Sequence, residues 1–288
     1  MRTKAIDRLV NSFVESNPSQ RKQIISLGAG TDTRYFRMKA RYQDPSKPNW
    51  VYHELDFSAN IVRKVGLIKK NTNGASEVSP LSLFNEDSKS DGDRDCTLDA
   101  PDYHLHPVDL RTLDSAKDPP PSFKAIDPSL PTLILSECCL CYLTPTAADN
   151  VALYFTKHLF PPMTPLGMII YEPIMPEDAF GKTMVSNLAA RGIILQTLQK
   201  YGSLKSQTER LKAYGFTDSS SLDVNELWER AIDAKEKERV AGLEMFDELE
   251  EWTLLASHYC VAWGWLECDG EPSAGLWTRW KAVFQSHA

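Results

Sequence analysis

The sequence predicts an α/β fold built on one doubly wound, mostly parallel sheet. Short apolar segments that fit strands alternate with longer segments that fit helices, as is typical of β-α units sharing a sheet. The segment Ile24–Arg37, IISLGAGTDTRYFR, fits a buried strand that turns at Gly28 and Gly30 into a helix. A carboxylate, Asp56, closes the next predicted strand, Trp50–Asp56. These observations place a ligand site at the carboxyl ends of the first strands.

The length of 288 residues allows one large α/β domain or two small ones, and the β-α alternation favours a single domain over residues 1–288. Hydrophobic residues make up 42% of the chain, which is enough for a sizeable core. A net charge of −7 argues against a nucleic-acid partner. Charges interrupt the first apolar residues, which excludes a signal peptide, and the longest nearly apolar run, 130–143, is too short to span a bilayer. We expect a cytoplasmic monomer with no membrane partner, and the six cysteines fit a reducing compartment.

The glycine turn indicates which kind of ligand fits. Gly28 and Gly30 lack side chains where a backbone must approach a ligand, and the helix that begins near Asp32 offers unpaired N–H groups. A dinucleotide site needs a third glycine, and Asp32 would repel a phosphate. The turn therefore suits a nucleoside with an ammonium-bearing tail, such as S-adenosylmethionine. A strand–turn–helix of any α/β fold is the alternative, but Asp56 favours a ligand because its carboxylate can accept both ribose hydroxyls.

The remaining elements are predicted from periodicity and from start and stop signals. Residues 2–16 carry apolar side chains at helical spacing and predict a helix that packs on the sheet. Ser58 is a suitable N-cap for a helix that runs to Lys70. The later segments that fit strands are 103–110, 133–143, 168–173, 215–224 and 259–267. The later segments that fit helices are 144–160, 177–214 and 225–258, with a last short segment at 273–288.

Two segments are expected to stand apart from the sheet. Residues 71–102 are polar and poor in aliphatic side chains, and we interpret them as an exposed, partly mobile insertion. Part of this insertion resembles the start of a calcium loop, but Cys96 stands where glycine is required and Asp102 where a glutamate should close the loop. We therefore expect no metal. The helical segment 177–214 is expected to cap the carboxyl edge and form a substrate region.

The predicted strand 133–143, LILSECCLCYL, contains an unexpected carboxylate, Glu137. A buried carboxylate is costly unless it is paired. Glu137 therefore either meets an arginine or backbone donor, or faces a ligand at the strand end, and we favour the ligand. Cys138 and Cys141 form a C-x-x-C motif, but residues three apart on a strand point to opposite faces. We interpret both as small buried side chains and not as metal ligands.

Several longer motifs carry a family resemblance. The chain is similar to the leucine carboxyl methyltransferases, enzymes that methylate the C-terminal leucine of the catalytic subunit of protein phosphatase 2A. The matching segments span nearly the whole chain in order. They are RTK at 2–4, ISLGAGTDTRYFR, HELDF, PVDLR, LILSECCLCYLTP, YEPIMPEDAFGKTMVSNLAARG, SQTERLKAYGF and LEMFDELEEWTLLASHYCVAW. The resemblance implies a class I, Rossmann-like methyltransferase fold and S-adenosylmethionine as cofactor.

The resemblance also implies roles for residues on the cofactor side. Gly28 would lie under the methionine part of S-adenosylmethionine, and Asp56 would hold the ribose. Asp109 and Leu110 would flank the adenine. Glu137 would sit against the amino acid end of the cofactor.

On the acceptor side, Arg2 matches an arginine that meets the carboxylate end of the cofactor, and Tyr142 and Arg37 match active-site residues. The acceptor carboxylate is ionised at neutral pH, so no general base is required. The enzyme's task is to position one carboxylate oxygen in line with the S–C bond and to exclude water. The alternatives are a surface salt bridge for Arg37 and a buried phenol with a backbone partner for Tyr142.

The family carries an extension before the arginine that Arg2 matches. This extension forms part of a lid, and we expect the present sequence to lack it. Two alternatives to a phosphatase methyltransferase follow. One is the tRNA wybutosine-type methyltransferases, which share the domain but add a C-terminal propeller. The other is a lid-less homologue that binds the phosphatase tail without turnover.

Overall fold

The computed structural model describes residues 1–42, 49–72, 98–113, 123, 125–242, 249–267 and 275–284. The helices are α1 (Arg2–Glu15), α2 (Arg34–Arg41), α3 (Ser58–Thr72), α4 (Pro145–Leu153), α5 (Ala179–Ala190), α6 (Leu204–Ala213), α7 (Val224–Ala231), α8 (Ala234–Ala241), α9 (Leu249–Ser257) and α10 (Thr278–Ala282). The strands are β1 (Lys22–Leu27), β2 (Trp50–Asp56), β3 (Leu98–Ala100), β4 (Tyr103–Pro107), β5 (Thr132–Glu137), β6 (Leu166–Pro173), β7 (Asp218–Asp223) and β8 (Tyr259–Trp265).

The strands form one sheet in the order β3-β4-β2-β1-β5-β6-β8-β7. The central strands from β4 to β6 are parallel, whereas β8 runs antiparallel to β6, and both edge strands, β3 and β7, pair antiparallel. From β1 the chain adds β2 and β4 on one side and then β5 and β6 on the other. The strand order therefore reverses between β1 and β5, which is where open α/β sheets bind ligands.

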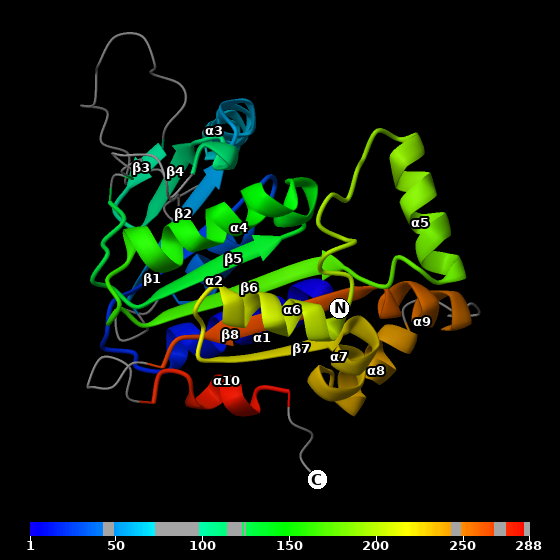
Figure 1. The fold of residues 1–288 in the computed structure, drawn as a ribbon. Helices are drawn as coiled ribbons and strands as arrows, with labels where there is room; N and C mark the ends of the chain where they lie inside the picture. The colour runs from blue at the N-terminus through cyan, green and yellow to red at the C-terminus, as the bar shows by residue number, and fades with distance from the viewer. Residues whose placement is uncertain are drawn as a thin grey trace.

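Helices cover both faces of the sheet, as Figure 1 shows, with α4 and α6 in front and α1 behind. One core joins α1, α2 and α3 to the sheet, and the other joins α4 and α6. The predicted stripe on α1 is fully buried: Ile6, Leu9, Val10, Phe13 and Val14 are each 0% exposed. Trp277, Trp280 and Phe284 also belong to the first core. The predicted doubly wound, mostly parallel fold is confirmed.

Several predicted boundaries are wrong. The strand expected at 133–143 ends at Glu137, because Cys138 has a positive φ of 48° and turns the chain into a 3-10 helix at Leu140–Tyr142. The helix expected at 177–214 is two helices, α5 and α6, separated by an irregular segment. The helix expected at 225–258 is divided into α7, α8 and α9. Helix α3 begins at Ser58 itself rather than being capped by it.

The polar insertion predicted at 71–102 lies largely outside the described residues. Its last part is ordered on the sheet: β3 pairs with β4, and the Asp102 carboxylate accepts a hydrogen bond of 2.9 Å from the Tyr35 hydroxyl. Helix α5, in the predicted cap, stands away from the sheet (Figure 1), and of its residues only Gly181 is buried.

Three histidines on one face of β2 and β4 predict an acid-sensitive fold. His53 is 0% exposed, its Nδ1 lies 3.1 Å from His106 Nε2, and its ring stacks on that of His104. Burial, followed by the nearby His106, His104 and Arg21, lowers the pKa of His53 from 6.5 to about 2. Between about pH 2 and pH 6.5, His53 is therefore protonated in the unfolded chain but neutral in the folded chain. The free energy of unfolding is highest above pH 6.5 and decreases as the pH falls below it.

We expect His53→Gln to flatten the fall in unfolding free energy between about pH 6 and pH 4, where one such histidine contributes up to about 1.4 kcal/mol per pH unit. Urea unfolding at several pH values measures this slope. The exposed His158 provides the control, because His158→Gln should leave the slope unchanged. An unchanged slope in the His53 variant would contradict the expectation.

Candidate functional site

The glycine turn after β1 lies where the strand order reverses. Both Gly28 and Gly30 have positive φ, 60° and 51°. The Gly28 N–H donates to the Leu55 carbonyl at 2.7 Å, which ties the turn to β2. A Cβ on Gly28 would lie 2.5 Å from the Cys139 sulfur. Glycine is therefore required at Gly28 both by backbone conformation and by space.

Asp56 ends β2 directly beside this turn and is 6% exposed. Its Oδ2 accepts the Gly30 N–H at 2.7 Å, and its Oδ1 accepts the Phe57 N–H at 2.7 Å and the Asn60 amide at 2.8 Å. These three donors fix the carboxylate's orientation and connect the turn, β2 and α3. Both lone pairs of Oδ1 are used, but Oδ2 keeps one, so the carboxylate can still accept a hydroxyl donor through Oδ2.

Asp56 faces a cavity of about 220 Å³, here called the aspartate cavity. Its walls come from the ends of β1, β2, β4 and β5. They are formed by Gly28, Gly30, Asp56, Phe57, Asn60, Val108, Asp109, Leu110, Cys138, Cys139, Tyr142 and Leu143. Asp109 pairs with Arg111 at 2.6 Å, and hydrogen bonds from Arg111 lower the pKa of this carboxyl. Leu110 is 6% exposed and gives the cavity an apolar wall.

The second cavity, of about 320 Å³, adjoins the first at Gly28 and is here called the arginine cavity. It lies between the amino end of α1, the glycine turn and the end of β5. Its lining residues are Arg2, Thr3, Ser26, Leu27, Gly28, Ala29, Thr31, Asp32, Thr33, Arg34, Arg37 and Glu137. Every site residue predicted from the sequence thus lines one of two adjoining cavities.

Arg34, which the sequence analysis missed, organises the arginine cavity. It is 2% exposed and donates to Asp7 at 2.8 Å, to Asp32, and to Glu137 at 3.2 Å. Burial alone would lower its pKa, but Tyr52, Asp32 and Asp7 raise the pKa of the guanidinium above its ordinary value. Arg34 therefore stays charged and holds the Asp32 and Glu137 carboxylates in place.

Glu137 also pairs with Arg2, whose Nε lies 2.7 Å from Oε1. The Arg2 guanidinium stands 5.5 Å from the centre of the Tyr171 ring, a cation–π contact. Glu137 thus meets two arginines and also borders a cavity. The pairing with arginine that the sequence left open for this carboxylate is confirmed, whereas its contact with a ligand stays a prediction.

The side chains of Tyr142 and Arg37 differ in whether their polar groups are already paired within the protein. The Arg37 guanidinium pairs with Asp7 but is 41% exposed and still borders the arginine cavity. Tyr142 is 43% exposed, so it is not a buried phenol, and among the described residues no group hydrogen-bonds to its hydroxyl. Burial and the neighbouring Cys141 and Cys138 raise the pKa of Tyr142 to about 12. The phenol is protonated at neutral pH and can donate a hydrogen bond.

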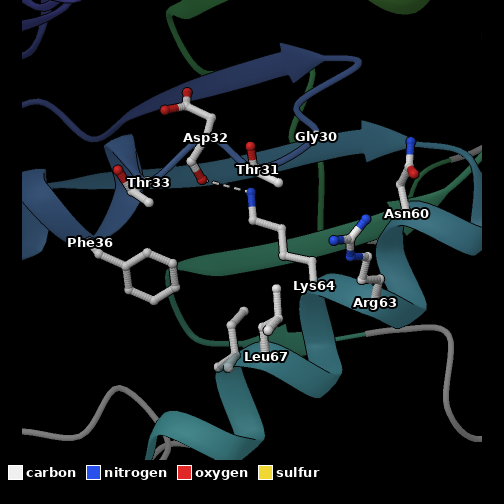
Figure 2. A pocket seen from close by; sticks show the side chains of 10 residues that line it. Gly30, Thr31, Asp32, Thr33, Phe36, Asn60, Arg63, Lys64 and Leu67 are labelled. Carbon is white, nitrogen blue, oxygen red and sulfur yellow. Dashed lines mark hydrogen bonds between the residues drawn. The ribbon is translucent and has the colours of Figure 1, made fainter.

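A third and larger cavity, of about 410 Å³, opens between α2 and α3 (Figure 2). Phe36 and Leu67 give it apolar walls, and Lys64 reaches across it to donate to the Asp32 carbonyl at 2.8 Å. Only Gly30 and Asp32 of the predicted site residues border it. The chemistry of the predicted site therefore belongs to the two smaller cavities.

Within the described ranges, no cluster of three or more His, Cys, Asp or Glu could hold a metal ion. The segment that resembles the start of a calcium loop lies mainly outside these ranges. In the part of the chain that the structure describes, no helix is both long and apolar enough to cross a bilayer.

The sheet order, the glycine turn and the carboxylate at the end of β2 define a class I methyltransferase fold. A solved structure from Thermobifida fusca, described as a candidate methyltransferase, aligns with a TM-score of 0.52 at 13% identity, over 91% of this chain and 80% of that one. This likeness concerns the fold alone.

The sequence comparisons identify the family. The leucine carboxyl methyltransferase family model matches residues 1–155. Leucine carboxyl methyltransferase 1 of Aspergillus fumigatus is 48% identical over 98% of this chain and 75% of its own length. The Emericella nidulans protein of the same name is 48% identical over 92% of this chain and 72% of its own. The chain belongs to the leucine carboxyl methyltransferase family, as the resemblance predicted.

The tRNA wybutosine-synthesizing protein 4 of rat is also related, at 33% identity over 91% of this chain. This chain covers only 37% of the rat protein, compared with 75% of the Aspergillus relative. The match is therefore lower in identity than those to the Aspergillus and Emericella proteins, and it covers a smaller share of the relative's length.

Proposed function

We propose that this protein transfers the methyl group of S-adenosylmethionine to the C-terminal leucine carboxylate of the protein phosphatase 2A catalytic subunit and so forms a methyl ester. The observation that carries the proposal is the pair of cavities joined at Gly28. The aspartate cavity presents Asp56 as a hydrogen-bond acceptor, and the arginine cavity presents carboxylates together with arginines. A nucleoside with a zwitterionic tail needs an acceptor for its ribose. It also needs groups of both charges around its amino acid end.

The residues fit S-adenosylmethionine in their donor and acceptor chemistry. Asp56 would hold the ribose by accepting a hydroxyl through Oδ2, while Asp109 and Leu110 would flank the adenine. Glu137 and Asp32 would face the ammonium, and Arg2 the carboxylate. A phosphate would meet the Asp32 and Glu137 carboxylates and be repelled, which argues against a dinucleotide in the same place.

The bound cofactor would supply an electrophilic methyl group on a sulfonium. The protein's own residues would then position the acceptor. Tyr142 is a protonated donor on the wall of the aspartate cavity, and Arg37 borders the arginine cavity, so both can orient an incoming carboxylate. No residue has to remove a proton, because a carboxylate is already ionised at neutral pH. Catalysis would come from holding the acceptor oxygen about 3 Å from the methyl group, in line and shielded from water.

Calorimetric titration tests the cofactor assignment. We expect S-adenosylmethionine and S-adenosylhomocysteine to bind at a single site, and NAD to give no heat of binding at the same concentration. Binding of NAD, with no binding of S-adenosylmethionine, would contradict the proposed roles of Asp32 and Glu137.

A further inference from the structure

The chain between α5 and α6 is fixed to the turn that carries Tyr142. It leaves the far end of α5 through Gly192, which has a φ of 76°, and returns toward the carboxyl end of β5 (Figure 1). The Gln196 N–H donates to the Cys141 carbonyl at 2.8 Å, and the Gln196 side-chain amide donates to the Tyr142 carbonyl at 2.5 Å. The segment 192–196, here called the return segment, therefore lies beside the turn that lines the aspartate cavity.

Two consecutive isoleucines on the return segment are exposed to solvent. Ile193 is 38% exposed, and Ile194 is 66% exposed, the highest value of any large hydrophobic side chain among the described residues. Single exposed apolar side chains are common on protein surfaces, but a pair beside a ligand cavity is a candidate contact surface. The chain enters the core only a few residues later, because Thr197 and Leu198 are 0% and 3% exposed. Both isoleucines are thus left outside a core that the same segment reaches.

Helix α5, which leads into the return segment, is anchored at its start but hardly buried. Asp178 Oδ1 accepts the Gly181 N–H at 2.7 Å, and the same oxygen lies 2.9 Å from His258 Nε2. Along the helix, Met184 and Leu188 stay partly exposed. The excursion from α5 to Gln196 is therefore held at both ends while its apolar side chains stay accessible. A surface that is already fixed in place loses little conformational entropy when a partner binds to it.

We propose that the return segment forms one wall of the acceptor subsite and that Ile194 packs against the side chain of the substrate's terminal leucine. This inference rests on the proposed function and deepens it, because it assumes a leucine carboxylate that Tyr142 orients. Ile194 stands two residues before Gln196, so their Cα atoms are at most about 7 Å apart. The leucine side chain leaves the carbon next to the carboxylate, so it would come within reach of this wall.

The apolar wall would supply a discrimination that the polar groups of the site cannot. Tyr142 and Arg37 would recognise a carboxylate, which every C-terminal residue carries. A wall at Ile194 favours a large aliphatic side chain, because contact removes apolar surface of both partners from water. A terminal alanine buries less surface there and gains less. Ile194 would therefore set the preference for leucine without taking part in methyl transfer.

A kinetic double-mutant cycle between Ile194 and the terminal leucine tests this contact. Wild type, Ile194→Ser and the conservative Ile194→Val are compared on phosphatase catalytic subunits that end in leucine or in alanine, at saturating S-adenosylmethionine. Calorimetry measures the affinity of each protein for S-adenosylhomocysteine. Met163→Ser is the matched control, because Met163 is 60% exposed and precedes the amino end of β6, whereas the site lies at the carboxyl ends of the strands.

With the leucine-ending subunit, we expect Ile194→Ser to raise KM about tenfold, or about 1.4 kcal/mol, with kcat and the affinity for S-adenosylhomocysteine unchanged. Ile194→Val should recover most of this loss, and Met163→Ser should match the wild type. With the alanine-ending subunit, Ile194→Ser and the wild type should have equal kcat/KM, because the contact is already absent. An equal loss on both subunits, an unchanged KM, or a fall in kcat at unchanged KM would each overturn the inference.

The outcomes also separate this inference from the proposed function. If wild-type protein transfers no methyl group to the leucine-ending subunit, the proposed function fails and the inference falls with it. If the wild type methylates that subunit and Ile194→Ser does so with the same KM, the proposed function stands and only the role of Ile194 is wrong.

Discussion

Replacing Arg210 with leucine is expected to lower the free energy of unfolding by about 3–5 kcal/mol, because it leaves an uncompensated buried charge. Arg210 and Glu172 are each 1% exposed, and Arg210 Nη1 lies 2.8 Å from Glu172 Oε2. The guanidinium also stacks 4.1 Å from the centre of the Tyr201 ring and donates from Nε to the Tyr214 hydroxyl at 2.6 Å. Both charged residues belong to the motifs that carry the family resemblance, and their role here is to join α6 to the end of β6.

Urea unfolding of the single variant, of Glu172→Gln/Arg210→Leu and of Lys205→Leu tests this account. The double variant removes both charges and should recover much of the loss. Lys205 also lies on α6, but its pair with Glu209 is 3.8 Å apart and exposed, so its replacement should cost less than about 1 kcal/mol. The account fails if the single variant is as stable as the wild type, or if the double variant is no more stable than the single one.

Asp56→Ala is expected to weaken cofactor binding by about 1.5–3 kcal/mol or more, through loss of charged hydrogen bonds to the ribose. The change also removes the acceptor of hydrogen bonds from the Gly30 N–H and the Asn60 amide, and this loss loosens the glycine turn. Asp56→Asn keeps the size of the side chain, exchanges one acceptor oxygen for a donor and should show a smaller loss. Calorimetric titration with S-adenosylmethionine measures all three proteins.

Asp127→Asn is the control, because Asp127 lies just before the amino end of β5, whereas the cofactor site lies at the carboxyl ends of the strands. The Asp127 carboxylate accepts a hydrogen bond from the Ser129 N–H. The affinity of this variant should match that of the wild type. Equal affinities for the wild type and Asp56→Ala would remove Asp56 from the cofactor site.

Local patterns allowed much of this architecture to be predicted. The strand that leads into Gly28 and Gly30, and the strand that ends at Asp56, each carry their signal within a few residues. By contrast, the role of Arg34 depends on Asp7 and Glu137, which are distant in the sequence. Such a network has no local signature, and only the folded chain brings its members together.

The C-x-x-C turn was missed for another reason. A nearly apolar run does not reveal where a strand stops, and no glycine marks the positive φ at Cys138. The break between α7 and α8 was missed because charged residues are good helix formers, so helical composition continues through it. The segment between α5 and α6 contains Gly192, with a φ of 76°, and Gly202, which were signals that the sequence analysis did not use.

Methyl transfer to the phosphatase tail tests the central claim most directly. Radiolabelled S-adenosylmethionine is incubated with this protein and three forms of the phosphatase catalytic subunit: intact, ending in an amide, or lacking the terminal leucine. We predict base-labile label on the intact subunit only, because the amide removes the nucleophilic carboxylate and the deletion removes the side chain that sets its depth. Equal labelling of the leucine-deleted and intact subunits would show that the terminal leucine carboxylate is not the acceptor and would contradict the account.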